Sequence, residues 1–297
     1  MTGKHIFYLP GKNPKPKKEP HRELIWCALL EGVRRADRSA ATLLQDNFSH
    51  FHLVGWNYTY YHIYKDITPD VAWVDAIIHK HGPTEQDMAE AHSWNMWLHH
   101  YALTLADHVP LVLKLLPEAV RSMANEIDCY FNNTDNLAFK VRELVKQELR
   151  RMLESHEEIL LVAHSLGTVI AYDALWELTH KEGLKGKLDF LTIGSPMGLH
   201  YIERHLLGQN EDGEKSYPDL IRRWVNISAE GDVVAFNQHL SECFHEMLER
   251  GLVDSIEDHC HGIYNFFRSD AGLNCHRSYG YLVNPAVGSV IAEWWKH

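Results

Sequence analysis

The feature that most constrains this chain is a small-residue segment between an apolar run and a helical stretch. Glu158–Ala163 is apolar after its first residue, which is typical of a strand buried on both faces of a sheet. Ala163-His164-Ser165-Leu166-Gly167 follows directly and leads into a predicted helix, Gly167–His180. Small residues two before and two after Ser165 allow a sharp turn that pushes its hydroxyl clear of the sheet, beside free backbone N–H groups. The simpler alternative is an ordinary helix N-cap serine.

Other short apolar runs give the chain an alternating pattern of strands and helices. Strands are predicted at His5–Leu9, Phe51–Trp56, Glu158–Ala163, Leu188–Ile193 and Trp224–Ser228. Helices are predicted at Arg22–Gln45, Gly167–His180 and Pro285–Trp295. This alternation predicts an α/β fold with a mostly parallel central sheet flanked by helices.

Residues 58–136 do not follow this rhythm. Two helices are predicted there, Thr84–Asp107 and Pro110–Tyr130. A helical excursion between two strands is interpreted as a cap over one edge of the sheet, with ordinary packing helices as the alternative. We therefore expect one domain, 1–297, that contains a helical cap at 58–136.

Charge and cysteine content exclude several classes of protein. With 29 basic and 40 acidic residues the net charge is −11, which argues against a nucleic-acid partner held by phosphate contacts. The five cysteines include no C-x-x-C pair, which favours a reducing compartment. No signal peptide is apparent, and no apolar segment is long enough to span a bilayer, so we expect a cytoplasmic protein without a transmembrane segment.

Metal and nucleotide sites are not indicated. The chain has 22 histidines, but none of their clusters has an H-E-x-x-H pattern or a spaced second pair of ligands. Residues 258–261 would be the first place to look for a metal. No glycine-rich phosphate loop occurs, so we expect neither a metal nor a cofactor.

The order of these motifs resembles the α/β-hydrolase superfamily of serine hydrolases, of the lipase/esterase type. The resemblance covers most of the chain outside the helical insertion. It consists of a first strand with a Pro10-Gly11 loop, the turn at Ser165, and Gly194-Ser195-Pro196 after the next strand, followed by an acid loop and a late histidine. It implies that the turn is a nucleophile elbow with Ser165 as nucleophile, although Ala163 stands where that family more usually has glycine.

The resemblance also implies a triad in the chain order serine, acid, histidine. Asp232 lies in the turn after the strand that ends at Ser228 and is the expected acid; Val233 stands where proline is usual. His276 precedes the closing helix and is the expected base. The alternatives are Glu230 and Asp258 for the acid, and His259 and His261 for the base.

An oxyanion hole is implied at two backbone N–H groups, those of Leu166 and Lys12, with Gly11 allowing close approach of the backbone. Pro10 replaces the family's histidine there. Trp56 and Tyr58 are expected to line an acyl pocket, with aromatic core packing as the alternative. Nearby lysines could favour an acidic substrate group or lie in a solvated loop; these are Lys12, Lys15, Lys17 and Lys18.

The function implied is hydrolysis of a carboxylic ester, through an acyl-enzyme on Ser165. The substrate would be a small-molecule ester or a lipid. A thioesterase or peptidase could use the same triad. The alternative from a different class is a hydrolase-fold module that binds a ligand or partner without turnover.

Overall fold

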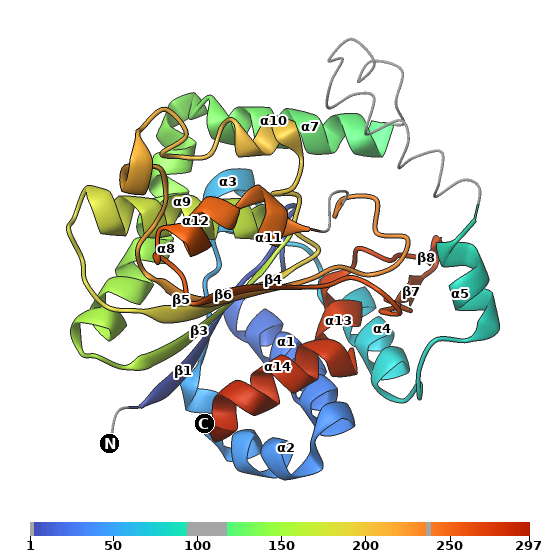
Figure 1. The fold of residues 1–297 in the computed structure, drawn as a ribbon. Helices are drawn as coiled ribbons and strands as arrows, with labels where there is room; N and C mark the ends of the chain where they lie inside the picture. Colours follow the sequence, from blue (N-terminus) through green and yellow to red (C-terminus); the bar gives the residue numbers. More distant parts are fainter. Residues whose placement is uncertain (1–2, 94–117, 236–238) are drawn as a thin grey trace.

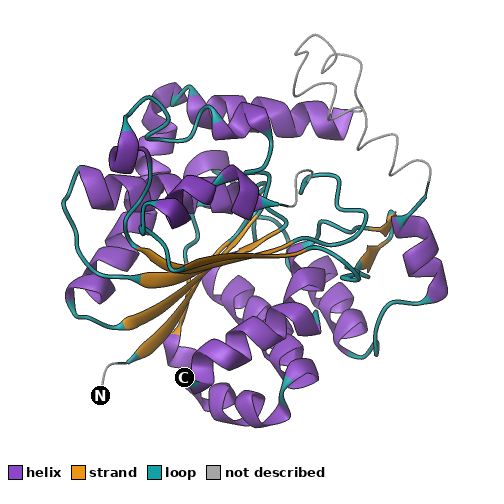
Figure 2. Ribbon diagram, viewed as in Figure 1, coloured by secondary structure: helices purple, strands orange, loops and turns teal. Residues whose placement is uncertain are grey.

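The centre of the molecule is a parallel sheet (Figures 1 and 2), in a computed structural model that describes residues 3–93, 118–235 and 239–297. Its strands are β1 (Lys4–Leu9), β2 (Phe51–Leu53), β3 (Glu158–His164), β4 (Leu188–Ile193), β5 (Ile221–Ile227) and β6 (Ser255–His259). They lie in the order β2-β1-β3-β4-β5-β6, and every neighbouring pair is parallel. A short antiparallel pair, β7 (Arg268–Ser269) and β8 (Gly272–Leu273), lies apart from it. The expected α/β class with a parallel sheet is confirmed.

Helices cover both faces of the sheet. The longer ones are α1 (Lys18–Ala36), α4 (Thr68–Ile78), α7 (Glu118–Phe131), α8 (Leu137–Glu154), α9 (Leu166–His180) and α14 (Pro285–Lys296). The shorter ones are α2 (Arg38–Leu44), α3 (Asn57–Tyr61), α5 (Glu85–Ala91), α10 (His200–Glu203), α11 (Leu240–Cys243), α12 (His245–Glu249) and α13 (Ser278–Leu282). Short 3₁₀ segments are η1 (Gln45–His50), η3 (Thr134–Asn136) and η4 (Gly213–Ser216).

Alternate side chains of each strand enter two separate cores. In β1, Phe7 and Leu9 pack with α8 and α9, whereas Ile6 and Tyr8 pack with α1, α2 and α14. Figure 1 shows α1, α2 and α14 together on one side of the sheet. All four of these β1 side chains are at most 1% exposed. A strand covered on both faces needs a continuous apolar run, which is why the period of two is absent from its sequence.

The strand order creates a switch point between β1 and β3. After β1 the chain adds β2 on one side, and it later adds β3 on the other side of β1. In open parallel sheets, ligands bind outside the carboxyl ends of the strands at such a point. The two segments that leave these strand ends are the Pro10-Gly11 loop and the turn at Ser165.

Several boundaries differ from the sequence prediction, and one strand was not predicted; β5, for example, spans Ile221–Ile227 and not Trp224–Ser228. The helix expected at Arg22–Gln45 is broken at Asp37, which has an extended backbone and whose side chain accepts the N–H groups of Ser39 and Ala40, so that α2 begins anew. The strand expected at Phe51–Trp56 ends at Leu53. Strand β6 was not predicted, because its sequence Ser-Ile-Glu-Asp-His is mostly polar, as suits the partly exposed edge of a sheet.

The described helices of the insertion pack on different parts of the molecule: α3 and α7 contact α8, α4 contacts α1, and α5 contacts β8. The helix predicted at Thr84–Asp107 appears as α5 up to Ala91, and the one predicted at Pro110–Tyr130 appears as α7; residues 94–117 lie outside the described part. The end of α5 lies against the turn after β5, where a Cβ on Gly231 would be 2.6 Å from the Ala91 carbonyl oxygen. Helix α7 lies beside α10 (Figure 1), and the Tyr201 hydroxyl donates to Asp128.

Candidate active site

Ser165 lies in the tight turn between β3 and α9. Its φ of 54° and ψ of −131° belong to a region that residues other than glycine rarely adopt. Its N–H donates to the Ile193 carbonyl at 3.2 Å. The turn also requires glycine at position 167, since a Cβ there would lie 2.7 Å from the carbonyl oxygens of both Leu9 and Pro10. Strain of this kind persists where the surroundings hold it, commonly at functional sites.

Three side chains from distant parts of the sequence form one hydrogen-bonded chain. His276 Nε2 lies 2.8 Å from Ser165 Oγ, and His276 Nδ1 lies 2.8 and 3.0 Å from the two carboxylate oxygens of Asp232. A carboxylate can only accept, so Nδ1 carries the imidazole proton and the lone pair of Nε2 accepts from the Ser165 hydroxyl. In this arrangement the hydroxyl proton can pass to the imidazole when the oxygen attacks an electrophile.

The Asp232 carboxylate is buried but well supplied with donors. It is 3% exposed, and it accepts from the Tyr281 hydroxyl at 2.6 Å and from the Val234 N–H at 2.9 Å. The Tyr281 oxygen in turn accepts the Ala229 N–H at 2.9 Å, which ties α13 to the acid turn. Burial, and then the charge of Asp232, raise the pKa of Tyr281 well above its usual value, so the tyrosine remains a donor.

Sequence reasoning did not single out Tyr281. Its only signal was its position five residues after His276, near the end of the short helix α13. Gly194, which was noticed only as part of Gly194-Ser195-Pro196, also shapes this site. Its φ is 57°, and a Cβ there would lie 3.0 Å from Asp232 Oδ2 and 3.2 Å from His276 Nδ1.

His164 supports the loop that carries His276. Its Nε2 lies 2.8 Å from the His276 carbonyl oxygen and therefore donates, which leaves a lone pair on Nδ1. Within the described part of the chain, that Nδ1 is buried without a hydrogen-bond partner. Burial, followed by the neighbouring His276, lowers the pKa of His164 well below its usual value. His164 is thus a neutral, fixed support for its neighbour.

The loop after β1 approaches Ser165 closely. A Cβ on Gly11 would lie 2.7 Å from the Cβ of Ser165. The Gly11 carbonyl accepts from the Asn57 amide at 2.8 Å, and the Pro10 carbonyl accepts from the Trp56 indole N–H at 2.7 Å. These two buried donors fix the orientation of the loop's peptide planes. Asn57 was not among the predicted site residues.

The two aromatic residues expected to line an acyl pocket lie in different environments. Trp56 is fully buried: its N–H donates to the Pro10 carbonyl, and its ring lies in the core against the rings of Tyr60 and Tyr61. Tyr58 is 46% exposed and stacks on Tyr64 with ring centroids 4.4 Å apart. Their contact with a substrate stays a prediction.

The alternative acids are occupied elsewhere. Glu230 accepts the Gly262 N–H at 3.2 Å and lies 3.5 Å from His92. Asp258 accepts the N–H groups of Leu240 and Ser241 at 3.0 and 2.9 Å, at the start of α11.

The alternative bases also have other surroundings. His259 ends β6 with its Nε2 3.8 Å from Glu257, and both His259 and His261 are exposed. The structure therefore brings Asp232 and His276 to Ser165, and it pairs the other acids and His259 with different residues.

Within residues 3–93, 118–235 and 239–297 no group of three or more His, Cys, Asp or Glu side chains could hold a metal ion. No helix in that part of the chain is both long and apolar enough to cross a membrane. In comparisons with known proteins, no family model, no curated protein and no solved structure matches the chain.

Proposed function

We propose that this protein is a serine hydrolase of the α/β-hydrolase type that cleaves carboxylic esters. The observation that carries the proposal is the hydrogen-bonded chain Ser165–His276–Asp232, with the serine held at positive φ at the carboxyl end of a central strand. A surface serine does not need a fixed imidazole on its hydroxyl and a buried carboxylate behind it. Nucleophilic catalysis needs both.

In the first half of the reaction, Ser165 Oγ attacks the acyl carbon while its proton moves to His276 Nε2. Asp232 holds the Nδ1–H and stabilises the imidazolium that forms. The tetrahedral intermediate then collapses. The bond from the acyl carbon to the alcohol oxygen breaks, and His276 gives its proton to that oxygen.

In the second half, water takes the place of the alcohol. His276 removes a proton from the water as its oxygen attacks the acyl-serine. Collapse of the second intermediate returns the proton to Ser165 Oγ and releases the carboxylic acid. The enzyme ends in its starting protonation state.

Two backbone N–H groups are proposed as the oxyanion hole, those of Leu166 and Lys12. In a trans peptide the N–H points away from the preceding carbonyl. The Ser165 carbonyl accepts from Thr168 N–H at 2.9 Å, and the Gly11 carbonyl accepts from Asn57. Both carbonyls are thus held by donors within the protein, which leaves the N–H of each peptide directed the opposite way.

The test is hydrolysis of p-nitrophenyl esters of increasing acyl length, with a thioester and an anilide of one shared acyl group. Ser165→Ala should abolish turnover, whereas the control Ser289→Ala, on the exposed side of α14, should retain it. Faster cleavage of the anilide or thioester than of the ester would overturn the ester assignment. Folded wild-type protein without any turnover would favour a ligand-binding module.

A further inference from the structure

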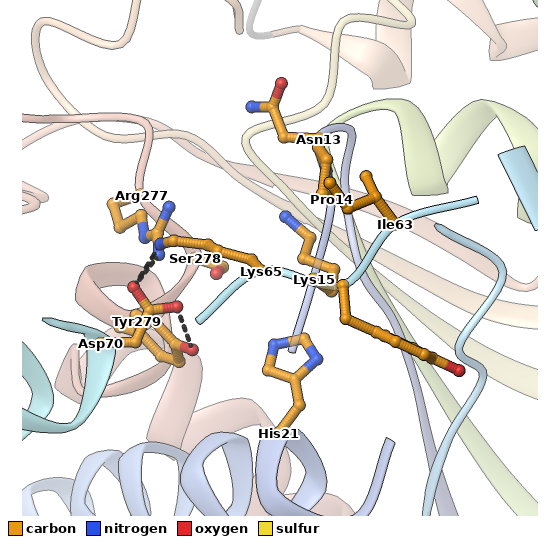
Figure 3. A pocket seen from close by; sticks show the side chains of 11 residues that line it. Asn13, Pro14, Lys15, His21, Ile63, Lys65, Asp70, Arg277, Ser278 and Tyr279 are labelled. Carbon is orange, nitrogen blue, oxygen red and sulfur yellow. Dashed lines mark hydrogen bonds and ion pairs between the residues drawn. The ribbon is translucent and has the colours of Figure 1, made fainter. Parts of the chain in front are cut away.

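A cavity of about 450 Å³ is lined in part by residues that adjoin the two segments of the candidate active site, and Figure 3 shows the side chains around this cavity. Its walls continue the two segments that form that site. Lys15 follows the Gly11-Lys12 loop by a few residues, and Arg277 directly follows His276. In the view of Figure 3, His21 of α1 faces it from below and Asp70 of α4 from the left.

The cavity carries more positive than negative charge. Among the described residues that line it, Lys15, Lys65 and Arg277 are cationic and Asp70 alone is anionic. Asp70 is 2% exposed, and one of its oxygens lies 2.6 Å from Lys65 Nζ and 2.8 Å from an Arg277 nitrogen. Two cations therefore share one carboxylate. This excess stands out in a chain whose net charge is −11.

Lys15 is the third basic side chain of the cavity, and within the described residues it has no carboxylate partner. Within the described part of the chain no carboxylate oxygen lies within 4.0 Å of its ammonium group, which instead donates to the Lys12 carbonyl at 2.7 Å. Burial, followed by the charge of Arg277, lowers the pKa of Lys15 to about 7. An ammonium group in this state gains from a bound anion, which supplies the missing counter-charge.

His21 adds a neutral polar wall. It is 3% exposed, and burial followed by the charge of Lys15 lowers its pKa to about 3. An uncharged imidazole can present one N–H donor without adding to the repulsion among the three cations.

The cavity lies within reach of a substrate bound at Ser165. The Lys15 ammonium contacts the Lys12 carbonyl, and Gly11 contacts Ser165 closely. Standard backbone dimensions then put Lys15 Nζ at most about 13 Å from Ser165 Cβ. A small ester can span that separation.

We propose that this cavity binds an anionic group, a carboxylate or phosphate, that the ester substrate itself carries. The anion contacts Lys15 and Arg277 while the ester carbonyl lies at Ser165. This inference rests on the proposed hydrolase function and narrows its substrate class to acidic esters.

The first experiment measures anion binding without catalysis. Calorimetry with inorganic sulfate is performed at pH 6, where Lys15 is protonated, on Ser165→Ala, alone and combined with Lys15→Gln or Lys17→Gln. Lys17 is an exposed lysine of the same loop and serves as the matched control. Sulfate should bind to Ser165→Ala. Its affinity should be at least about tenfold lower when Lys15→Gln is added, and it should be unchanged when Lys17→Gln is added. Absent binding, or equal loss with both variants, would overturn the proposal. Lys65→Gln replaces Lys15→Gln if the latter does not fold.

The second experiment compares acidic esters with their neutral methyl-ester counterparts. One series carries the carboxylate on the acyl part, as mono-p-nitrophenyl succinate, glutarate and adipate, and another carries it on the alcohol part. At least one acidic ester should have a KM about tenfold below that of its neutral partner, and Lys15→Gln should remove the difference. Equal KM values in both series would overturn the proposal. If sulfate binds but no ester is turned over, neutral esters included, the hydrolase function is refuted. The claim that the bound anion belongs to an ester substrate is then refuted as well.

Discussion

Replacing Gly11 with alanine tests how the loop after β1 contributes to the site. The new Cβ would lie 2.7 Å from Ser165 Cβ, 2.8 Å from His164 Nδ1 and 3.1 Å from the His164 carbonyl oxygen. Carbon atoms make favourable contact at about 3.5 Å or more, so the loop must retreat by roughly 1 Å. The hydrogen bonds from Trp56 and Asn57 to the loop carbonyls resist that movement.

The magnitude follows from two effects. Overpacking of a close contact lowers the free energy of unfolding by about 1–3 kcal/mol. Displacement of the Lys12 N–H removes one proposed oxyanion donor, which lowers kcat by about 10²–10³-fold. We therefore expect a folded but slow Gly11→Ala enzyme, with the loss mainly in kcat.

The assay is kcat and KM with p-nitrophenyl butyrate, together with thermal unfolding of each variant. Gly55→Ala is the control, because a Cβ there would contact only Lys18 Cγ, at 3.9 Å. It should leave both activity and stability close to wild type. A folded Gly11→Ala protein with wild-type kcat would refute the role given to this loop.

Three further predictions concern Tyr281, His276 and the buried His21. Tyr281→Phe removes a donor to Asp232 and the acceptor of the Ala229 N–H. The free energy of unfolding, measured in urea, should fall by about 1.5–3 kcal/mol, and kcat should fall roughly tenfold. An unchanged kcat would mean that Tyr281 does not position Asp232. His276→Gln should lower kcat by at least about 10⁴-fold, whereas His259→Gln should leave kcat unchanged. The reverse result would show that the base is His259 and not His276. The pKa of His21 is about 3 when folded and 6.5 when unfolded, so below pH 6.5 only the unfolded state binds the proton. The free energy of unfolding should therefore fall by about 1.4 kcal/mol per pH unit as the pH drops toward 3. In urea unfolding between pH 6 and 4, His21→Gln should reduce this slope. Equal slopes for the wild type and the variant would contradict the prediction.

The sequence predicts the parts of the fold that depend on burial or local geometry. Strand β4 is apolar apart from Asp189 and Thr192 and has the predicted bounds, and β3 extends only one residue further than predicted. Strand β6 lacks that signal because it lies at an edge of the sheet. The break at Asp37 depends on a capping hydrogen bond inside a stretch that otherwise reads as helical.

Some residues of the site could be predicted from local sequence or chain order, and others could not. The turn at Ser165 is encoded by neighbours in sequence, and chain order led to Asp232 and His276, which the structure brings into hydrogen-bond contact with it. Tyr281 and Asn57 act across the fold, 49 and 46 residues from the groups they contact, so no local pattern marks them. The direction of the Trp56 side chain, into the loop carbonyl, likewise depends on packing.

Labelling with a fluorophosphonate, followed by peptide mapping, tests directly whether Ser165 is an activated nucleophile. The reagent forms a bond from phosphorus to the attacking serine oxygen and releases fluoride, so it reports an activated nucleophile without a natural substrate. We expect one adduct per chain, on Ser165; it should be lost in Ser165→Ala and should form much more slowly in His276→Gln. Labelling that persists in Ser165→Ala, or that maps to another residue, would contradict this expectation.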